Sequence, residues 1–252
     1  MQLALSHPAP PPLAPPPFEA QHPAESSPLA RFALFASVPA PLLAQLAADI
    51  TCQHHRGGEH LWYAGDQARH ITLIERGIVE IERTRRSGDG VVLGLFGTGQ
   101  SVGLPAALAG SAYPADAVAL GDRVDVVRVR ATALVQLMQR HLSFTLAVNR
   151  ALLQHNAALR SSIEILGAGA VPKRLAVLFL FLGHRFGSTD AGGCLHIHLA
   201  LTREQIGRLV GARVETVIRI ISRWQKAGWI KGARSGIEIA RVDMLQRMAD
   251  AG

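Results

Sequence analysis

The side chains best suited to chemistry in this chain lie between residues 213 and 223. If the segment between Gly211 and Ala227 is helical, one of its faces is apolar and the other polar. The apolar face carries Val217, Ile220, Ile221 and Trp224. The polar face carries Glu215, Thr216, Arg219 and Arg223. Arginine can bond guanine and glutamate can accept from cytosine, so this face suits the major groove of DNA. The alternative is an ordinary helical hairpin with a solvated charged face.

Neighbouring residues predict the elements that hold this helix. Thr202 and Gln205 have the spacing of a capping box, which starts a helix by satisfying its first free amides. An apolar stripe at i, i+3 and i+4 follows, formed by Ile206, Leu209 and Val210. Gly211 allows the positive φ that ends this first helix tightly. Short alternating runs at 229–231 and 237–239 predict a β-hairpin, which completes a winged helix-turn-helix.

Positive charge is concentrated in the same region. Residues 199–240 hold three acids and eight bases, an excess of five that makes up most of the formal net charge of +7. The bases are Arg203, Arg208, Arg213, Arg219, Arg223, Lys226, Lys231 and Arg234. Such a surface is typical of a protein that binds the phosphate backbone of double-stranded DNA. The residues expected to contact DNA are Thr202, Arg203, Arg213, Glu215, Thr216, Arg219 and Arg223.

The whole-chain composition favours a cytoplasmic nucleic-acid binder. The 252 residues allow one large or two modest domains, and 48% are hydrophobic, enough for well-formed cores. Cys52 and Cys194 cannot make a disulfide framework, which fits a reducing cytoplasm. The longest apolar run, 175–183, is too short to span a bilayer, and the N-terminus makes a poor signal peptide. The pI of about 10.4 favours a nucleic-acid partner, although cationic surfaces also attract membranes and acidic proteins.

The order of elements predicts an α+β protein with four parts. Residues 1–28 are proline-rich and expected to be disordered, and 29–130 form an antiparallel β-roll. A helix and a glycine hinge occupy 131–168, and the winged unit occupies 169–245. The strands expected in the roll are 60–64, 70–75, 78–83, 91–96, 117–120 and 124–129, with turns that include 87–90. Helices are expected at 41–50 and 102–109.

The long helix at 131–166 carries a heptad repeat. Its a and d positions are Leu142, Thr145, Asn149, Leu152, Asn156, Leu159, Ile163 and Leu166. Asparagines at such positions can pair across a two-fold axis and specify a parallel dimer. The expected dimer interface is Asn149, Leu152, Asn156, Leu159, Ile163 and Leu166. The alternative is a helix packed on its own domain. A homodimer is favoured because helix-turn-helix proteins usually read two half-sites.

Taken together, 32–240 resembles the CRP/FNR superfamily of bacterial transcription regulators. The most specific matches are LTREQIGRLVGARVETVIRI at 201–220 and HLWYAGDQARHITLIERGIVEIER at 60–83. The resemblance implies a cyclic-nucleotide-binding-like roll that senses a signal, a homodimer, and an RNA polymerase partner. It also implies that Glu215 and Arg219 read base edges and that Thr216 lies near phosphates. Val-Glu-Thr at 214–216 is closer to the FNR branch, which commonly has serine where this chain has Ile218.

The expected effector pocket departs from the cyclic-AMP branch of this family. Its residues are Gly103, Leu104, Tyr113, Pro114 and Ala115. The resemblance aligns Leu104, Pro114 and Ala115 with the glutamate, arginine and serine that hold the ribose and the cyclic phosphate. A buried phosphate without a cation costs several kcal/mol, so cyclic AMP is disfavoured and the effector is unidentified.

Two cofactors remain for consideration. An iron–sulfur cluster usually needs four thiolates, twice the number in this chain. Haem needs only one or two axial ligands, for which His54, His55, His60 or His70 could serve. A lone histidine, however, is more often a surface or packing residue.

Two other classes of protein compete with a DNA-binding regulator. A cupin-like metal enzyme would use His60, His70, Glu75 and Glu80, but the close His-x-His pair of that fold is missing there. The chain's only such pair, His196 and His198, precedes the winged unit and is expected to pack in its sheet. A cyclic-nucleotide-responsive subunit of a kinase or channel needs an intact phosphate pocket. We therefore expect no enzymatic activity, no catalytic residues and no metal site.

Overall fold

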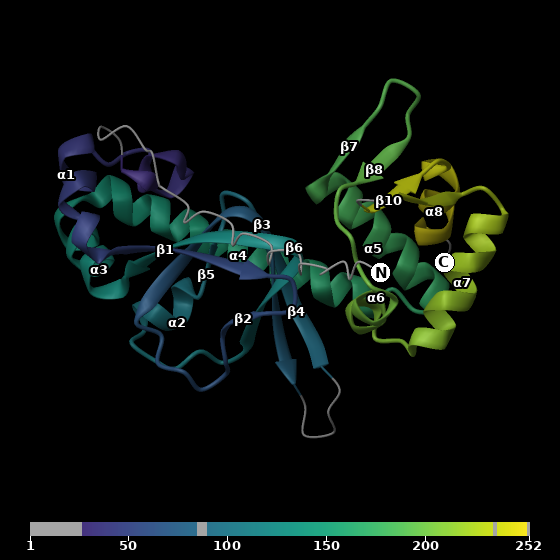
Figure 1. Ribbon diagram of the computed structural model, residues 1–252, viewed down its shortest axis with the longest axis horizontal. Coiled ribbons are helices and arrows are strands. Elements are labelled where there is room, and N and C mark those ends of the chain that lie inside the picture. Colours follow the sequence, from purple (N-terminus) through teal and green to yellow (C-terminus); the bar gives the residue numbers. More distant parts are fainter. Residues whose placement is uncertain (1–26, 85–89, 234–235, 251–252) are drawn as a thin grey trace, which may run out of the picture.

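The computed structural model describes residues 27–84, 90–233 and 236–250. It shows a β-roll, a long helix and a smaller C-terminal unit in that order (Figure 1). The predicted α+β class, with a roll, a long helix and a winged unit, is confirmed. The proline-rich tail at 1–28 lies almost wholly outside the described residues, as do most of the turn at 87–90 and Arg234.

The roll is an antiparallel sheet in the order β1-β6-β3-β4, with β2 added to β6 and β5 added to β3. Its strands are β1 (Ile50–Arg56), β2 (His60–Trp62), β3 (His70–Thr84), β4 (Gly90–Gly97), β5 (Ser101–Val102) and β6 (Asp116–Arg130). The strands predicted at 70–75 and 78–83 are one continuous strand, as are those predicted at 117–120 and 124–129. Gly77, at φ +93°, and Gly121, at φ +79°, bend these strands without ending them.

The N-terminal helix is shorter than predicted, because the chain turns into a strand that the sequence pattern did not indicate. Short helical turns cover Pro28–Arg31 (η1), Ala33–Phe35 (η2) and Ala47–Asp49 (η3), and α1 spans only Ala40–Gln45. β1 begins at Ile50, where the helix was expected to end, and pairs with β6 from Ile50 opposite Val129. The strand ITCQHHR is mostly exposed and polar, so it lacks the alternation from which a strand is predicted.

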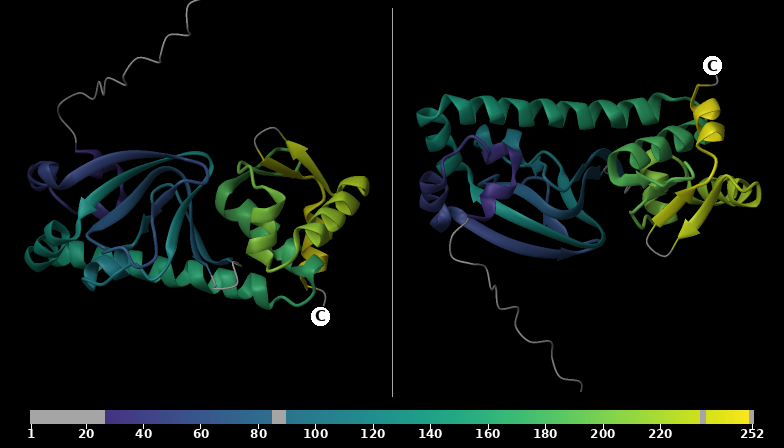
Figure 2. Two further views of the ribbon diagram at one scale, coloured as in Figure 1. Left: turned by 60° about the horizontal axis from the view of Figure 1, so that its bottom comes forward. Right: turned by 90° about the horizontal axis from the view of Figure 1, so that it is seen from above.

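Two helices follow the roll in place of the single helix predicted at 131–166. They are α3 (Ala131–Arg140) and α4 (Leu142–Gly167), separated by His141 in an extended conformation. In Figure 2, α4 runs along one side of the roll and continues to the C-terminal unit. It is buried in both hydrophobic cores: Phe144 and Val148 lie in the roll core, and Ile165 lies in the core of the C-terminal unit. This one helix therefore connects the two units physically.

The C-terminal unit is a winged helix-turn-helix. Its elements are α5 (Val171–Phe186), β7 (Gly187–Thr189), β8 (Leu195–Ile197), α6 (Arg203–Val210), α7 (Val214–Lys226), β9 (Ile230–Ala233), β10 (Gly236–Ile239) and α8 (Val242–Asp250). The sheet order is β7-β8-β10-β9, so the predicted hairpin joins a second hairpin. His196 lies half-buried in β8, 3.0 Å from Asp190, whereas His198 directly after β8 is exposed, so the packing role expected of the pair does not extend to His198. Within the described residues, no helix is long and apolar enough to cross a membrane.

The short helix α2 (Leu104–Leu108) lies between β5 and β6, inside the range predicted at 102–109. Gly103 precedes it with φ +75°. A Cβ at that position would lie 2.8 Å from the ring of Tyr113, so both the backbone conformation and the close packing require glycine. This turn positions the residues of the expected effector pocket.

Candidate functional site

The outer face of α7 has the predicted composition. Val217, Ile220, Ile221 and Trp224 are buried in the core of the C-terminal unit. Glu215, Arg219 and Arg223 are exposed, and Thr216 is half-buried beside them. Figure 1 places α7 on the side of the C-terminal unit that faces away from the roll. The helix therefore offers an acceptor, a hydroxyl and two guanidinium groups to a partner without obstruction from the rest of the chain.

Three features fix α6 and the turn that joins it to α7. The capping box is present: Gln205 N donates to Thr202 Oγ1 at 3.1 Å, and Thr202 N donates to Gln205 Oε1 at 2.8 Å. Gly211 adopts φ +58°, as the sequence predicted. Arg174 of α5 donates to the carbonyl oxygens of Val210 and Gly211 at 2.6 and 3.2 Å. These carbonyl groups lie at the C-terminal end of α6 and have no partner within the helix. Arg174 therefore satisfies them and stabilises the turn.

Two residues outside the turn shape it and could not be predicted from the sequence, namely Arg174 in α5 and Gly207 in α6. A Cβ on Gly207 would lie 2.8 Å from the carbonyl oxygen of Ala212, so α6 can approach the turn only with glycine there. Neither residue has a recognisable local sequence pattern. Arg174 acts from another helix, and Gly207 matters because the backbone of the turn packs closely against it.

The remaining residues predicted to contact DNA differ in their solvent exposure and in their existing contacts. Arg213 and Thr202 are exposed, although the hydroxyl of Thr202 is engaged in the cap. Arg203 is half-buried at the wing, and this burial lowers its pKa. Arg208, which contributed to the basic charge count, points to the roll instead and pairs with Glu80 and Glu82. The basic surface around α7 is therefore smaller than the charge count suggests.

The predicted dimer residues fall into two groups on α4. Asn149, Asn156, Leu159 and Ile163 are exposed. Leu152 is half-buried against the roll core. Leu166 lies so close to Gly211 that a Cβ there would be 3.2 Å from its Cδ2. The large apolar side chains that α4 exposes are Leu142, Leu146, Leu153, Leu159 and Ile163. Leu146 and Leu153 were missed because they lie beside the a and d positions on which the heptad was counted.

The expected effector region is a cavity of about 280 Å³. It is lined by Trp62, Ile81, Leu93, Phe96, Gly103, Pro105, Ala106, Tyr113, Pro114, Ala115, His155 and Leu159. Four of the five predicted residues are in this lining, whereas Leu104 is fully buried in the roll core and does not line the cavity. Among the residues that the structure describes, no lysine, arginine or carboxylate lines the cavity. The arrangement therefore offers no counter-charge to an anion.

His155 is a polar lining residue that was not predicted from the sequence. It comes from α4, far along the chain from the segment that supplies Tyr113, and its ring packs on Phe96 with 4.7 Å between centroids. Burial lowers the pKa of the ring, and an interaction with the backbone of Ser101 opposes this shift. Nε2 is buried and has no hydrogen-bond partner among the residues that the structure describes.

The histidines considered for haem lie elsewhere in the roll and do not line this cavity. His54 contacts Asp125 at 2.6 Å, His60 stacks on Tyr63 at 4.3 Å, and His70 lies 3.2 Å from Arg128. His55 is half-buried, and burial lowers its pKa. In the described parts of the chain, no three metal-ligating side chains lie close enough together to hold a metal ion. The cupin-like set of His60, His70, Glu75 and Glu80 therefore does not form a site in these parts. The cysteines lie on different units, Cys52 in β1 and Cys194 beside β8.

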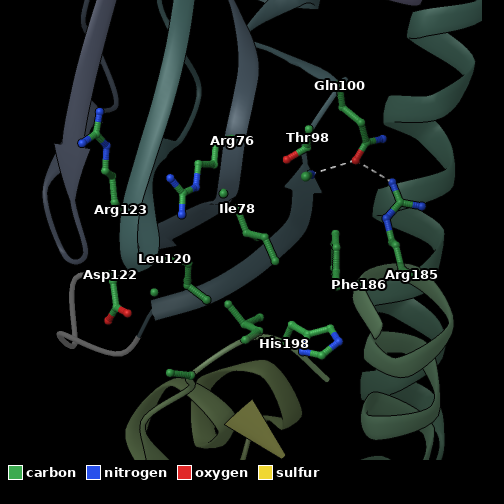
Figure 3. A pocket seen from close by; sticks show the side chains of 15 residues that line it. Arg76, Ile78, Thr98, Gln100, Leu120, Asp122, Arg123, Arg185, Phe186 and His198 are labelled. Carbon is green, nitrogen blue, oxygen red and sulfur yellow. Dashed lines mark hydrogen bonds between the residues drawn. The ribbon is translucent and has the colours of Figure 1, made fainter. Parts of the chain in front are cut away.

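The roll and the C-terminal unit meet at a cleft of about 720 Å³, shown in Figure 3. Arg185 of α5 donates to Gln100 Oε1 at 2.9 Å, and the same oxygen accepts from Gly97 N at 2.9 Å. Phe186 packs so closely on Gly97 that a Cβ there would lie 2.7 Å from its ring. Arg76 and Arg123 reach the cleft from the roll, and His198 reaches it from the other unit (Figure 3).

A second contact between the units involves two carboxyl groups and one guanidinium. Arg208 of α6 lies 3.4 Å from Glu80 Oε1 and 3.3 Å from Glu82 Oε2, both on β3. Glu80 is fully buried, beside Glu82 and Arg208. Burial raises its pKa to about 8, with Glu82 adding to the rise and Arg208 opposing it. Glu80 therefore holds its proton more readily than a solvated glutamate does, although the guanidinium of Arg208 opposes this.

Comparison with known proteins was made for the whole chain. A family model for the cyclic nucleotide-binding domain matches residues 52–141, and one for the Crp-like helix-turn-helix domain matches residues 173–248. A CRP-like cAMP-activated global transcriptional regulator of Mycobacterium tuberculosis (strain CDC 1551 / Oshkosh) is 26% identical over 221 residues, covering 88% of this chain and 98% of that protein. The fumarate and nitrate reduction regulatory protein of Escherichia coli (strain K12) is 26% identical over 192 residues, covering 76% of each.

Solved structures show the same fold. FixK2 from Bradyrhizobium japonicum superposes with a TM-score of 0.69 at 18% identity, covering 81% of this chain and 98% of that one. A transcriptional regulator of the CRP family from Thermus thermophilus gives a TM-score of 0.66 at 21% identity, covering 79% and 97%.

Proposed function

The chain belongs to the CRP/FNR superfamily of bacterial transcription regulators, and we propose that it reads an inverted-repeat operator as a homodimer controlled by its β-roll. It is a DNA-binding regulator, and the outer face of α7 is the observation that carries the proposed reading mode. Glu215 and Arg219 project from a helix whose inner face is buried and whose preceding turn is held by Arg174, which supports a role for both in base reading.

Each exposed side chain of α7 has a role that its chemistry supports. Arg219 donates two hydrogen bonds to a guanine, and Glu215 accepts one from a cytosine. Thr216, Arg223 and Arg213 contact phosphates near the helix, and Thr202 and Arg203 do so from α6. These contacts position the helix, whereas the base contacts select the sequence.

Ile218 gives the reading face an apolar member. Its side chain is 46% exposed, next to Arg219. An apolar side chain on a reading helix can contact the C5-methyl group of thymine. Ile218 therefore favours a thymine beside the guanine that Arg219 reads, where a serine would be less selective.

The apolar stripe of α4 supports the homodimer. Leu142, Leu146, Leu153, Leu159 and Ile163 leave an apolar line in solvent along a helix of 26 residues. A second copy of α4 covers this line, and Asn149 and Asn156 on the same face fix the register of the pair. The two-fold axis then presents two α7 helices to two half-sites.

The contact of Arg208 with Glu80 and Glu82 supports control by the roll. It joins α6 of the reading unit directly to β3 of the roll, and α4 joins the same two units as a continuous helix. A change in the roll that moves β3 or α4 therefore changes how α7 is presented. The effector itself is unidentified, RNA polymerase is the proposed protein partner, and the protein acts by binding in the cytoplasm without catalysing a reaction.

The experiment that tests this function is selection from a pool of random DNA duplexes by the full chain. We expect an enriched inverted repeat whose half-sites each contain a guanine, with two chains bound per duplex. Arg219→Ala should lose the preference at that base pair in both half-sites. Enrichment of no sequence, or of a site without two-fold symmetry, would overturn the proposed reading mode.

A further inference from the structure

We propose that the cleft between the roll and the C-terminal unit binds a small organic dianion, with one acidic group on Arg76 and the other on Arg185. This site goes beyond the proposed reading of DNA, and its lining shares no residue with the cavity beside α4. The cleft volume of about 720 Å³ is within the range of small-molecule sites. Arg76 belongs to β3 of the roll, whereas Arg185 belongs to α5 of the C-terminal unit (Figure 3).

Arg76 carries a charge that no described carboxylate neutralises. Its side chain is exposed in the cleft and forms no ion pair with a residue that the structure describes. The neighbouring Arg123 differs, because its Nε donates to Asp125 Oδ1 at 2.7 Å. Arg76 is therefore open to an anion, whereas Arg123 is already engaged.

Arg185 also lacks a carboxylate partner among the described residues, although its position is fixed. Its Nη2 donates to Gln100 Oε1 at 2.9 Å, and its guanidinium carbon lies 5.8 Å from the centroid of the Phe186 ring. Both partners are uncharged, and burial lowers the pKa of Arg185 because the cation is partly withdrawn from water. An anionic group of a ligand would supply the charged partner that these contacts do not provide.

The rest of the lining determines how many charges the ligand carries and what lies between them. Asp122 is the carboxylate of the lining in the described part of the chain, and it pairs with neither Arg76 nor Arg185. Two guanidinium groups are therefore left for two anionic groups. Ile78 and Phe186 lie between these two arginines in Figure 3, so the body of the ligand meets an apolar wall.

The position of the two arginines gives the ligand a structural effect. A dianion held at both ends contacts β3 of the roll and α5 of the C-terminal unit at once. Its binding stabilises the arrangement of the two units in which Phe186 packs on Gly97.

The test uses titration calorimetry of the full-length protein at fixed ionic strength. Naphthalene-1,5-disulfonate has an anionic group on each side of an apolar body, naphthalene-1-sulfonate has one such group, and naphthalene-1-sulfonamide is uncharged. We expect the disulfonate to bind about three- to tenfold more tightly than the monosulfonate, the net worth of one further charged contact. The sulfonamide should bind more weakly than either anion.

Four variants assign the second charge to its residues. Arg76→Gln and Arg185→Gln should each bind the disulfonate about as weakly as wild type binds the monosulfonate. Arg185→Lys keeps the charge and should retain a preference for the disulfonate, which guards against a variant that simply packs poorly. Arg223→Gln is the matched control, since it removes one charge from the exposed face of α7 and should leave binding unchanged.

The inference is wrong if the disulfonate does not bind wild type more tightly than the monosulfonate, or if either glutamine variant of the cleft keeps the full preference. Equal losses in Arg185→Lys and Arg185→Gln would also contradict it, because packing and not charge would then matter. An equal loss in Arg223→Gln would place the anion on the outer face of α7 instead.

The test contains no DNA, so it is separate from the test of the proposed function. If the disulfonate preference is absent while an inverted repeat is still selected from random DNA, only the cleft site is wrong. If the preference is present while no inverted repeat is selected, only the reading mode is wrong.

Discussion

The reading unit and the roll differ in how their functional residues are arranged along the chain. The side chains proposed to contact DNA come from one continuous segment, 202–223, whose backbone is fixed by a capping box and a glycine turn. The cavity of the roll is assembled from segments between Trp62 and Leu159, with α4 as its outer wall. A continuous site keeps its chemistry when its local pattern is kept. An assembled site can change its ligand through a few substitutions while the fold stays the same.

The largest effect is expected from breaking the dimer, on which both regions depend. Leu153 and Ile163 are 65% and 69% exposed, so Leu153→Glu with Ile163→Glu should leave the fold intact and give monomers. Loss of the second half-site should weaken operator binding by about 10²-fold or more. Sedimentation and operator titration measure the two outcomes.

Leu152→Glu is the contrasting variant for the dimer. Leu152 packs on the roll core, so its replacement should lower the thermal stability of the roll. A stable dimer in the Leu153 and Ile163 double variant would show that this stripe is not the interface.

The next effect concerns base reading. Arg219→Ala should cost about 1–3 kcal/mol on the selected operator and relax one base pair in each half-site. Arg223→Ala is the matched control, because a lost phosphate contact weakens all sequences to a similar extent. Competition titrations with single-base variants of the operator distinguish the two. Unchanged sequence preference in Arg219→Ala would mean that another residue reads the guanine.

A smaller effect is expected from pH at the contact between the units. The pKa of Glu80 is raised to about 8, so the folded contact binds a proton that unfolded or solvated Glu80 would have released. This contribution to stability is complete below about pH 4.5 and is lost as the pH rises through the window to about 8. Glu80→Gln should remove this pH-dependent contribution. The difference in thermal unfolding temperature, wild type minus Glu80→Gln, should therefore decrease as the pH rises from 5 to 8.

Glu75→Gln provides the control for that measurement. Glu75 lies on the same strand but is half-buried and pairs with Arg31, away from the reading unit. It should leave the pH dependence in this window close to that of wild type. If Glu80→Gln also keeps that dependence, the buried carboxyl does not govern the contact.

The smallest effect is expected at Ile218. Ile218→Ser removes the contact with the thymine methyl group but leaves Arg219 in place. We expect operator affinity to fall by less than for Arg219→Ala and the preference to weaken at one neighbouring base pair only. Repeated selection from random DNA with this variant reads out the change. An identical selected sequence would show that Ile218 does not touch a base.

The same difference between continuous and assembled sites explains what could be predicted from the sequence. The capping box at Thr202, the turn at Gly211 and the two faces of α7 follow from local rules, and all are present. Arg174 and His155 could not be found, because each acts on a segment distant in sequence. β1 was not predicted because an exposed strand lacks an alternating pattern. The exposed apolar side chains of α4 could not be identified from the sequence, because they depend on which side of the helix the roll covers.

The central claim is that a symmetric DNA reader of the CRP/FNR type is controlled here by something other than cyclic AMP. Its most direct test is a titration of the selected operator duplex with the full-length protein, with and without cyclic AMP. We predict two chains per inverted repeat and an affinity that cyclic AMP leaves unchanged. Binding of one chain per duplex, or an affinity that rises with cyclic AMP, would contradict the account.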